Sequence, residues 1–387
     1  MIDTKLFRAR TEFNKEERIP DTGAWTVAAD IGYSGVKGMN PAGHFCFPSY
    51  AVRIDGDRGM LGEADPSYIL YTDLETGAQW AIGKYAQDRI SDRDTSVTEE
   101  ALFGRERYDD PMFRVLIRTA LGFGMDRGRT SPDGRKLVIQ TGYPPAYQAD
   151  SEDLISAFAG EHHFSLRRGN LPAKDYHIRA DRNQVFLMAQ PMGTLFSVMV
   201  GNEGVPVPGM SKLLKKNVLV FDAGFGTLDL FPVRGGHLEQ NFSNPKLGMR
   251  RVMQETCMAL KSSGVDVGVP ALQKYLEDGY ARFHTRKSSK KVELCGILEE
   301  CSEKICLEAV DWMTQGIPVY EYDYLIITGG AGDAWYDKIS EALKDMETLK
   351  ILRGNENDRI PMVYANVRGY YLYRAAKSLS GKGGART

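Results

Sequence analysis

Two short segments of the chain each place an aspartate directly before a glycine-containing bend, which is chemistry suited to a phosphate and its metal. The first segment is Asp30-Ile-Gly-Tyr-Ser-Gly-Val-Lys37, and the second is Asp222-Ala-Gly-Phe-Gly-Thr-Leu-Asp229. Glycines let backbone N–H groups approach an anion closely, and an aspartate can hold the water shell that Mg²⁺ retains. One such bend is common, but two matched copies predict a pair that holds one triphosphate and its Mg²⁺ from both sides.

A lysine and a third glycine cluster add to this candidate site. Lys37 ends the first bend and can reach the β- and γ-phosphates as a point charge, although alone it would be an ordinary strand lysine. Asp229 holds the matching place in the second bend, where its charge favours a structural or metal-adjacent role. The cluster Gly329-Gly-Ala-Gly332 runs from a strand into a helix, where backbone N–H groups can face a nucleotide. It lacks the GxGxxG spacing, and no GxxxxGK[ST] sequence exists, so Rossmann and P-loop sites are disfavoured.

Each aspartate ends the first strand of a predicted three-stranded meander. The strands of the first copy are predicted at 25–30, 36–39 and 44–52, and those of the second at 217–221, 227–233 and 237–242. A histidine follows the aspartate by 14 residues in the first copy and by 15 in the second. A two-fold repeat at this separation predicts duplicated domains rather than a solenoid.

Helices alternate with strands in the rest of the chain, which predicts an α/β fold. Helices are predicted at 112–123, 151–159, 249–262, 269–279 and 294–313, and strands at 136–141, 164–168, 175–180, 184–188 and 324–328. The segment 190–193 is interpreted as a break after a strand. Asp333 is the predicted cap of a helix that runs to about Met346. We interpret 201–216 as a surface loop and the first 24 residues as a flexible or loosely docked arm.

Composition excludes several classes of protein. The formal net charge of -2 gives no support for direct binding of nucleic acid. No apolar run approaches the roughly 18 residues that span a bilayer, so no membrane partner is expected. The first 24 residues lack the apolar centre of a signal peptide. Five cysteines without a CxxC pair indicate a reducing compartment, and therefore a cytoplasmic protein.

The three glycine motifs together resemble the phosphate-1, phosphate-2 and adenosine motifs of the actin, sugar-kinase and heat-shock-chaperone ATPase superfamily. Within it, the chain most resembles the bacterial and archaeal actin-like proteins of the ParM/Alp plasmid-segregation type, over about residues 25–375. Four further stretches carry this likeness: Thr141-Gly-Tyr-Pro-Pro145, Gln190-Pro-Met-Gly-Thr194, Lys246-Leu-Gly-Met249 and Ala365-Asn-Val-Arg-Gly-Tyr-Tyr-Leu372.

The resemblance implies an actin-like, ribonuclease H-like fold. Two duplicated domains, each with a mixed five-stranded sheet and helices, would flank a nucleotide cleft, and two smaller inserted subdomains would extend from them. The expected division is an arm at 1–24, a first half at 25–216 with an insertion at about 53–95, a second half at 217–358 with an insertion at about 263–318, and a C-terminal segment at 359–387 that returns to the first half.

The resemblance also implies roles for individual residues. Asp30 and Asp222 would hold hydrated Mg²⁺, Asp222 would also serve catalysis, and Gln190 would orient the attacking water. A glutamine cannot take a full proton, so its contribution would be positioning. Glu255 would reach the ribose or base, with an exposed helical glutamate as the equal alternative. The residues implied to bind ATP or GTP are Asp30, Gly32, Tyr33, Ser34, Gly35, Lys37, Gly224, Phe225, Gly226, Thr227, Glu255, Gly329, Gly330, Ala331 and Gly332.

Three functions remain open on this superfamily. The favoured one is a filament-forming ATPase that self-associates and drives plasmid segregation through a DNA-binding adaptor protein. The alternative is a sugar or small-metabolite kinase, which needs an aspartate base just ahead of the second bend, whereas the nearest, Asp181, lies well upstream. A chaperone-like ATPase normally carries a large substrate-binding extension, and only a short tail follows Tyr373.

Overall fold

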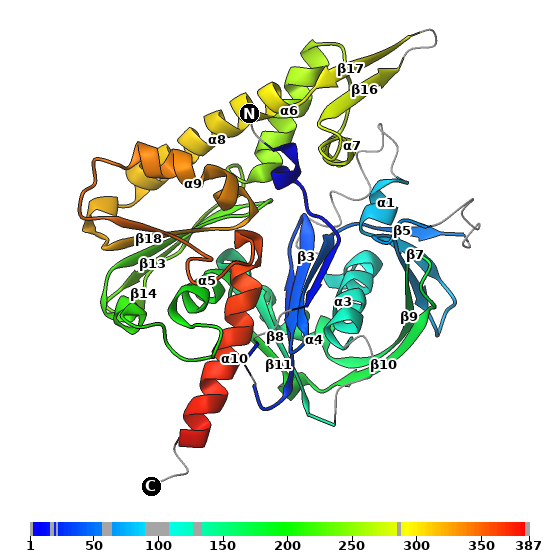
Figure 1. Ribbon diagram of the computed structural model, residues 1–387, viewed down its shortest axis with the longest axis horizontal. Coiled ribbons are helices and arrows are strands. Elements are labelled where there is room, and N and C mark those ends of the chain that lie inside the picture. Colours follow the sequence, from blue (N-terminus) through cyan, green and yellow to red (C-terminus); the bar gives the residue numbers. More distant parts are fainter. Residues whose placement is uncertain are drawn as a thin grey trace.

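Two mixed β-sheets with matching strand order form the centre of the molecule (Figure 1). The computed structural model describes residues 3–15, 19–20, 22–55, 64–89, 108–126, 134–284 and 288–383. The first sheet has the order β1 (Glu12–Lys15), β4 (Gly43–Pro48), β3 (Gly35–Asn40), β2 (Trp25–Ile31), β8 (Leu137–Tyr143) and β11 (Val185–Ala189). The second has the order β14 (His237–Leu238), β13 (Leu228–Arg234), β12 (Val218–Ala223), β18 (Tyr324–Thr328) and β19 (Lys350–Arg353), with β15 (Phe242–Asn244) also on β13.

The pairing of these strands confirms the predicted duplication. β2 pairs antiparallel with β3 and parallel with β8, and β12 likewise pairs antiparallel with β13 and parallel with β18. All residues of β2 and β12 are buried, as expected for central strands covered on both faces. Two related halves, each built on a mixed sheet, therefore make up the α/β fold.

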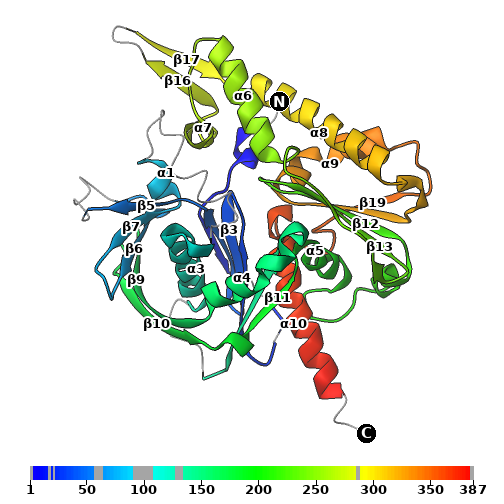
Figure 2. The same cartoon turned by 180° about the vertical axis from the view of Figure 1, so that it is seen from behind.

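Helices α5 (Gln190–Met199) and α10 (Ala365–Gly383) lie side by side between the two sheets, as both views show (Figures 1 and 2). Leu195 and Val198 of α5 and Leu372 of α10 pack into one core with Val218 and Val220 of β12. α10 also contacts β2, β3 and β8 of the first sheet. This helix pair therefore joins the two halves at the base of the space between them.

The outer faces of the two sheets are covered by different helices. α6 (Met249–Ser262), α8 (Cys295–Gly316) and α9 (Gly330–Ala342) cover the second sheet, and their apolar side chains share one core with β12 and β13. α3 (Pro111–Gly124) covers the first sheet, together with α4 (Ser151–Phe158). No helix among the described residues is long and apolar enough to cross a bilayer.

A third sheet and a separate hairpin extend the two halves. The sheet has the order β10 (Lys174–Ala180), β9 (Gly160–Arg168), β6 (Ile69–Asp73), β7 (Gln79–Ile82) and β5 (Ala51–Ile54), followed in the chain after β7 by α1 (Lys84–Gln87). The hairpin consists of β16 (Tyr280–His284) and β17 (Ser289–Glu293), beside α7 (Val269–Tyr275). The segments predicted as insertions at 53–95 and 263–318 contribute to these two parts.

Three local predictions from the sequence are wrong. The strand predicted at 44–52 is two strands in different sheets, because the chain turns after Pro48, where Tyr50 N donates to Pro48 O at 2.8 Å. The strand predicted at 237–242 is also interrupted, because β14 ends at Leu238 and β15 begins only at Phe242. The break predicted at 190–193 is confirmed, since β11 ends at Ala189 and α5 begins at Gln190, with Pro191 in its first turn. Asp333 is not the cap of α9, because Gly329 holds that place with φ of 86° and Asp333 lies within the first turn.

Candidate functional site

The two predicted bends meet at one cavity between the halves. Asp30 near the end of β2 and Asp222 near the end of β12 both line this cavity of about 220 Å³, and both are buried. A side chain added at Gly226 would lie 2.5 Å from the ring of Tyr33, so the second bend packs directly against the first. Matching strands in duplicated sheets therefore bring the matching aspartates to a shared space.

Most of the predicted catalytic and nucleotide-binding residues line this cavity. They are Asp30, Gly32, Tyr33, Ser34, Lys37, Gln190, Asp222, Gly224, Phe225, Gly226, Thr227, Gly329, Gly330 and Ala331. Three predicted residues, Gly35, Glu255 and Gly332, are not among its lining. Glu255 instead forms ion pairs with Arg251 at 2.5 Å and with Lys304 at 3.6 Å.

Asp30 is held by two neighbours that the sequence also singled out. Gln190, the first residue of α5, donates from Nε2 to Asp30 Oδ1 at 3.1 Å. Lys37 Nζ lies 3.5 Å from Asp30 Oδ2. Lys37 pairs directly with Asp30 in the β2–β3 register, and residues opposite each other in an antiparallel pair share one face of the sheet. The carboxylate therefore touches an amide donor and an ammonium group before any ligand binds.

Asp222 is more deeply enclosed, and its carboxyl group is close to other negative charges. Burial raises its pKa to about 7, and the nearby Asp229 and Asp30 act in the same direction. The bond from Asn366 Nδ2 to Asp222 Oδ2, 2.9 Å long, and the charge of Lys37 oppose this rise. Carboxylates that repel one another across a buried space provide a favourable place for a divalent cation.

A hydrogen-bond network behind Asp222 was not assigned from the sequence. Thr194 Oγ1 donates to Asn366 Oδ1 at 2.6 Å and lies 2.9 Å from Thr328 Oγ1. These buried groups connect α5, α10 and β18 at the floor of the cavity. The stretches around residues 190–194 and 365–372 carried the family resemblance, but no local pattern tells which side chain reaches Asp222.

The second bend is anchored to a helix N-terminus. Gly224 and Phe225 accept backbone hydrogen bonds from Met249 N and Arg250 N, at 3.0 and 2.8 Å. A side chain added at Gly248 would lie 2.5 Å from Phe225 O, so only glycine allows this approach. Thr227 Oγ1 donates to Asp229 Oδ2 at 2.8 Å, which gives Asp229 a structural partner.

Two helix N-termini also reach the cavity and favour negative charge there. Met249 begins α6 and Gly330 begins α9, and both residues line the cavity. The first N–H groups of a helix lack partners within the helix, and the helix dipole is positive at this end. Buried carboxylates for a hydrated cation, glycine backbones and two helix N-termini together fit a nucleotide with Mg²⁺.

The N-terminal arm also reaches this site, which the sequence did not indicate. Residues 5–10 and Glu12 line the cavity. Residues 4–7 form a 3-10 helix that contacts α9, and β1 lies at the edge of the first sheet. The prediction of a flexible or loosely docked arm is therefore wrong for residues 3–15. Short segments of this kind are ordered by distant partners rather than by local propensity.

Comparison with known proteins agrees with this architecture. A family model described as "Actin like proteins N terminal domain" matches residues 28–193. No curated protein sequence matches the chain. Among solved structures, a 15-stranded ParM filament from Clostridium botulinum is 18% identical with a TM-score of 0.67, covering 91% of this chain and 99% of that one. The actin-like protein Alp7A is 14% identical with a TM-score of 0.65, covering 93% and 98%.

A third similar structure includes a nucleotide. It is the archaeal actin homologue Ta0583 in complex with ADP, which is 16% identical with a TM-score of 0.62 and covers 90% of this chain and 98% of its own. The first half therefore matches the model of the actin-like protein N-terminal domain, and the chain as a whole has the actin-like fold seen in ParM and Alp structures.

Proposed function

We propose that this protein binds ATP or GTP with Mg²⁺ between its two halves, hydrolyses it, and assembles into filaments. The observation that carries the proposal is the placement of the buried Asp30 and Asp222, on matching strands of duplicated sheets, at one cavity. The solved ADP complex of an archaeal actin homologue supports nucleotide as the ligand class.

The side chains around the cavity have separate tasks in this proposal. Asp30 and Asp222 hold the water shell of the Mg²⁺, whose charge would neutralise the phosphate oxygens. A cation beside Asp30 would replace the positive charge that Lys37 supplies in this structure, which leaves Lys37 Nζ free to contact a phosphate. The two bends and the N-terminus of α9 bind phosphate oxygens through backbone N–H groups. The first N–H groups of α6 hold the second bend, so this helix contributes the positive end of its dipole.

Gln190 is suited to place the attacking water. Its amide has both a donor and an acceptor, and its Nε2 is already fixed on Asp30. The Oε1 atom therefore has a defined direction at the start of α5, where the helix leaves the first sheet. Its contribution is orientation of the water rather than removal of a proton.

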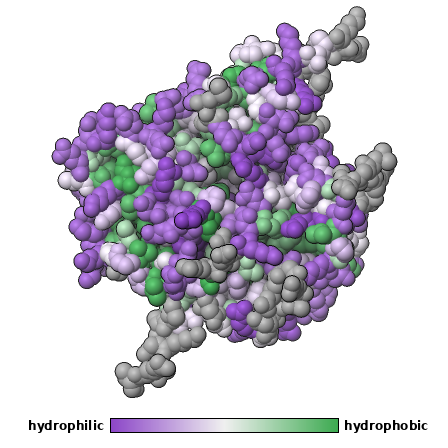
Figure 3. Space-filling model, viewed as in Figure 1, coloured by the Kyte–Doolittle hydropathy of each residue, from purple (hydrophilic) through white to green (hydrophobic). Residues whose placement is uncertain are grey.

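Assembly follows from coupling between the cleft and the surface. A nucleotide favours assembly only if it binds the assembling conformation more tightly, and head-to-tail contacts that do not close produce a filament. The face in Figure 3 is mostly hydrophilic in its described part, with hydrophobic residues in small separate groups. The described part of this face therefore suits reversible subunit contacts rather than a permanent hydrophobic interface.

The cellular role that we propose is plasmid segregation in the cytoplasm, with a DNA-binding adaptor protein between filament and DNA. The likeness to ParM structures supports this role. A net charge of -2 gives no basis for direct contact with DNA, so the adaptor is the expected link.

Light scattering and negative-stain microscopy of the purified protein with ATP, GTP or no nucleotide test the proposal. We expect nucleotide-dependent filaments and release of phosphate, both lost in Asp222→Asn. A solution that stays clear while ADP release depends on an added sugar would instead show a metabolite kinase. A protein that binds neither nucleotide would exclude the proposed function altogether.

A further inference from the structure

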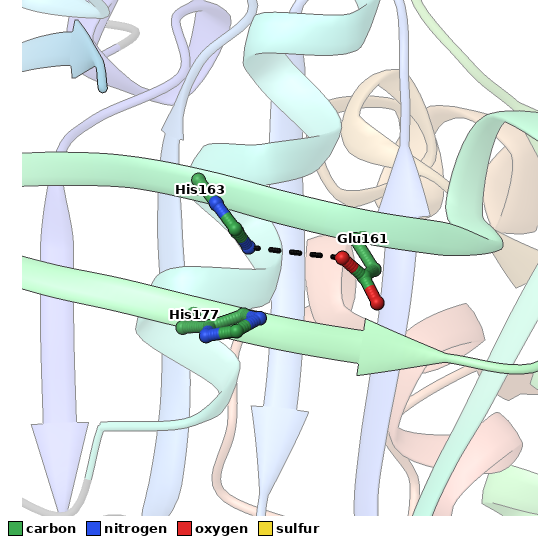
Figure 4. A group of neighbouring side chains, drawn as sticks. All are labelled: Glu161, His163 and His177. Atoms are coloured by element: carbon green, nitrogen blue, oxygen red, sulfur yellow. Dashed lines mark ion pairs between the residues drawn. The ribbon is translucent and has the colours of Figure 1, made fainter. Parts of the chain in front are cut away.

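A second group of side chains suited to a cation lies away from the cleft, on the hairpin of β9 and β10 (Figure 4). Glu161 and His163 are two residues apart on β9 and therefore point to the same face of the strand. His177 of β10 is the direct register partner of His163. Residues that face each other in this way share one side of the sheet, so all three side chains gather on one surface.

The three side chains are already close to a metal-binding arrangement. One ligand atom from each lies within 4.8 Å of the others. His163 Nε2 is 4.0 Å from Glu161 Oε2, and the centres of the two imidazole rings are 4.0 Å apart. A tetrahedral zinc ion with bonds of about 2.0–2.1 Å places its ligand atoms roughly 3.3 Å apart. Small rotations of these partly exposed side chains would bring the ligand atoms to the separation that zinc requires.

The surroundings of His163 define which of its nitrogens faces the site. Nδ1 lies 3.9 Å from Glu75 Oε1, on the loop after the neighbouring strand β6. Nε2 is shielded from solvent and makes no hydrogen bond to another described residue. A carboxylate beside one imidazole nitrogen leaves the other as the lone-pair donor, an arrangement typical of histidines that bind metals.

We propose that Glu161, His163 and His177 bind a divalent transition metal, with Zn²⁺ the best match. Imidazole nitrogen suits Zn²⁺, Ni²⁺ and Cu²⁺, whereas Mg²⁺ prefers oxygen ligands. Three protein ligands leave one position for water or for a group from a partner. Arg179 lies 3.9 Å from Glu161 but its side chain is 71% exposed, so it competes weakly. The metal would fasten the edge strand β10 to β9.

Calorimetric titration of the untagged full-length protein with ZnCl₂ tests this site. We expect one Zn²⁺ per chain and a higher melting temperature with the metal. His177→Ala and Glu161→Gln should each weaken binding at least about tenfold. His237→Ala, which removes an exposed histidine on β14, is the matched control and should bind as wild type does. Absence of binding in the wild type, or unchanged binding in His177→Ala, would overturn the proposal.

The arm formed by residues 3–15 contacts both halves of the molecule, independently of the metal site. Thr4 Oγ1 donates to Leu276 O at 2.7 Å, and Arg8 Nη1 donates to Glu277 Oε2 at 2.7 Å, both in the second half. Phe7 is buried in the core of that half. At its other end, β1 pairs with β4 of the first sheet. Figure 1 shows this dark-blue segment running from beside α6 to the strands around β3.

The arm also fills space at the nucleotide cavity. Phe7 and Arg8 line it together with Ala331, on the helix that opens with the third glycine cluster. The remaining volume of about 220 Å³ is smaller than the roughly 300–1,000 Å³ of typical small-molecule sites. A nucleotide that reaches this glycine cluster would therefore meet the arm.

We infer that the arm is an internal competitor for the adenosine end of the cleft, an inference that rests on the proposed function. Nucleotide binding would displace residues 4–8 and break the Arg8–Glu277 ion pair. Residues 4–8 hold the arm on the second half, and β1 holds it on the first sheet, so release of residues 4–8 would also loosen one connection between the halves. The affinity for nucleotide would then depend on the contacts of Thr4, Phe7 and Arg8 with the second half.

Dissociation constants of a fluorescent ATP analogue, measured by equilibrium titration with full-length variants, test the arm. We expect Arg8→Ala to bind about two- to fivefold more tightly, and Phe7→Ala more tightly still. Arg234→Ala is the control, because it breaks arginine–glutamate pairs with Glu321 at 2.5 Å and with Glu239 at 3.0 Å, outside the cavity lining. Circular dichroism confirms that each variant is folded.

The measured affinities distinguish the role of the arm from the proposed nucleotide binding. Wild type and Arg8→Ala binding with equal affinity, or weaker binding in the folded variants, would overturn the competing arm while leaving the proposed function in place. No binding in the wild type or in any variant would remove the proposed function, and the arm inference with it.

Discussion

At the scale of single residues, the site depends on buried charge. Asp222 accepts a hydrogen bond from Asn366 and lies within electrostatic range of two further aspartates, and burial is the main reason that its pKa rises to about 7. The negative charge of Asp222 is repelled by Asp229 and Asp30, and a bound cation would offset this repulsion. The charge of Asp222 therefore serves ligand binding rather than stability of the free protein.

We expect Asp222→Asn to lower phosphate release at least about a hundredfold while the protein stays folded. The amide keeps the shape of the carboxyl group but cannot hold the water shell of Mg²⁺ with a negative charge. Phosphate-release kinetics and thermal melting measure the two effects. Asp345→Asn, at an exposed position, is the control. An unchanged rate in Asp222→Asn would rule out the assigned role in metal binding.

The variant Gln190→Ala distinguishes positioning of the attacking water from binding of the nucleotide. We expect kcat to fall by about ten- to a hundredfold, while the nucleotide dissociation constant changes by less than about twofold, because Gln190 contacts Asp30 and not the bends. Steady-state hydrolysis and equilibrium binding give the two numbers. If kcat fell and the dissociation constant rose by the same factor, Gln190 would support the site as a whole and would have no separate role in placing the water.

At the scale of elements, the crossing of α5 and α10 sets the spacing of the two halves. A side chain added at Gly369 would lie 1.6 Å from Gly193 O, and one added at Gly193 would meet Asn366 O at 2.5 Å. Both helices therefore need glycine where they touch. The same crossing brings Asn366 to Asp222 and Thr194 to Asn366, so packing and site geometry share one cause.

Gly369→Ala should destabilise the protein by more than about 2 kcal/mol, because the added carbon collides with backbone that cannot move aside. Urea unfolding measures the change. Gly296→Ala, in the first turn of α8 with open space around it, is the matched control and should be neutral or stabilising by up to about 1 kcal/mol. Equal stability of the two variants would contradict the close crossing.

At the scale of the whole molecule, a few contacts connect the two halves near α1 and α7. Tyr50 OH donates to Gln273 Oε1 at 2.8 Å, and Lys84 Nζ lies 3.9 Å from Glu277 Oε2, which also binds Arg8. Burial opposes ionisation of Glu277, but Arg8 and Lys84 outweigh it and hold the pKa of this carboxyl group below its ordinary value. Glu277 thus connects the arm, α1 and the second half through charge.

A lowered pKa means that the folded protein binds fewer protons than the unfolded chain, so this contribution is present above about pH 4.5 and is lost as the pH falls. We expect Glu277→Gln to lower the free energy of unfolding at pH 7 by less than about 1 kcal/mol, since the group is half exposed. The loss should shrink below pH 4. Urea titrations at several pH values measure it.

The control for this pH dependence is Glu341→Gln, whose ion pair with Lys344 lies three residues away along the chain. Its stability should follow the pH profile of the wild type. A Glu277→Gln profile that parallels the wild type at every pH would show that the ion pairs of Glu277 with Arg8 and Lys84 contribute nothing measurable.

The sequence by itself determined the local chemistry. Aspartate before a glycine bend is a short-range pattern, and its repetition predicted both the duplication and the strands that end at Asp30 and Asp222. The helix at 249–262 and the strand at 324–328 were predicted with the bounds that the structure has, because hydrophobic period and flanking glycine are local signals.

Only the tertiary structure decided which distant residues meet. Asn366 reaches Asp222 across 144 positions, and Thr4 reaches Leu276 across 272. Glu255 lies on the predicted helix but is held by Lys304 of a neighbouring helix, away from the cavity. Such contacts depend on strand order and helix crossing, which fix positions in space only after the whole chain has packed. A short window of sequence records which side chain is present but not which distant partner it meets.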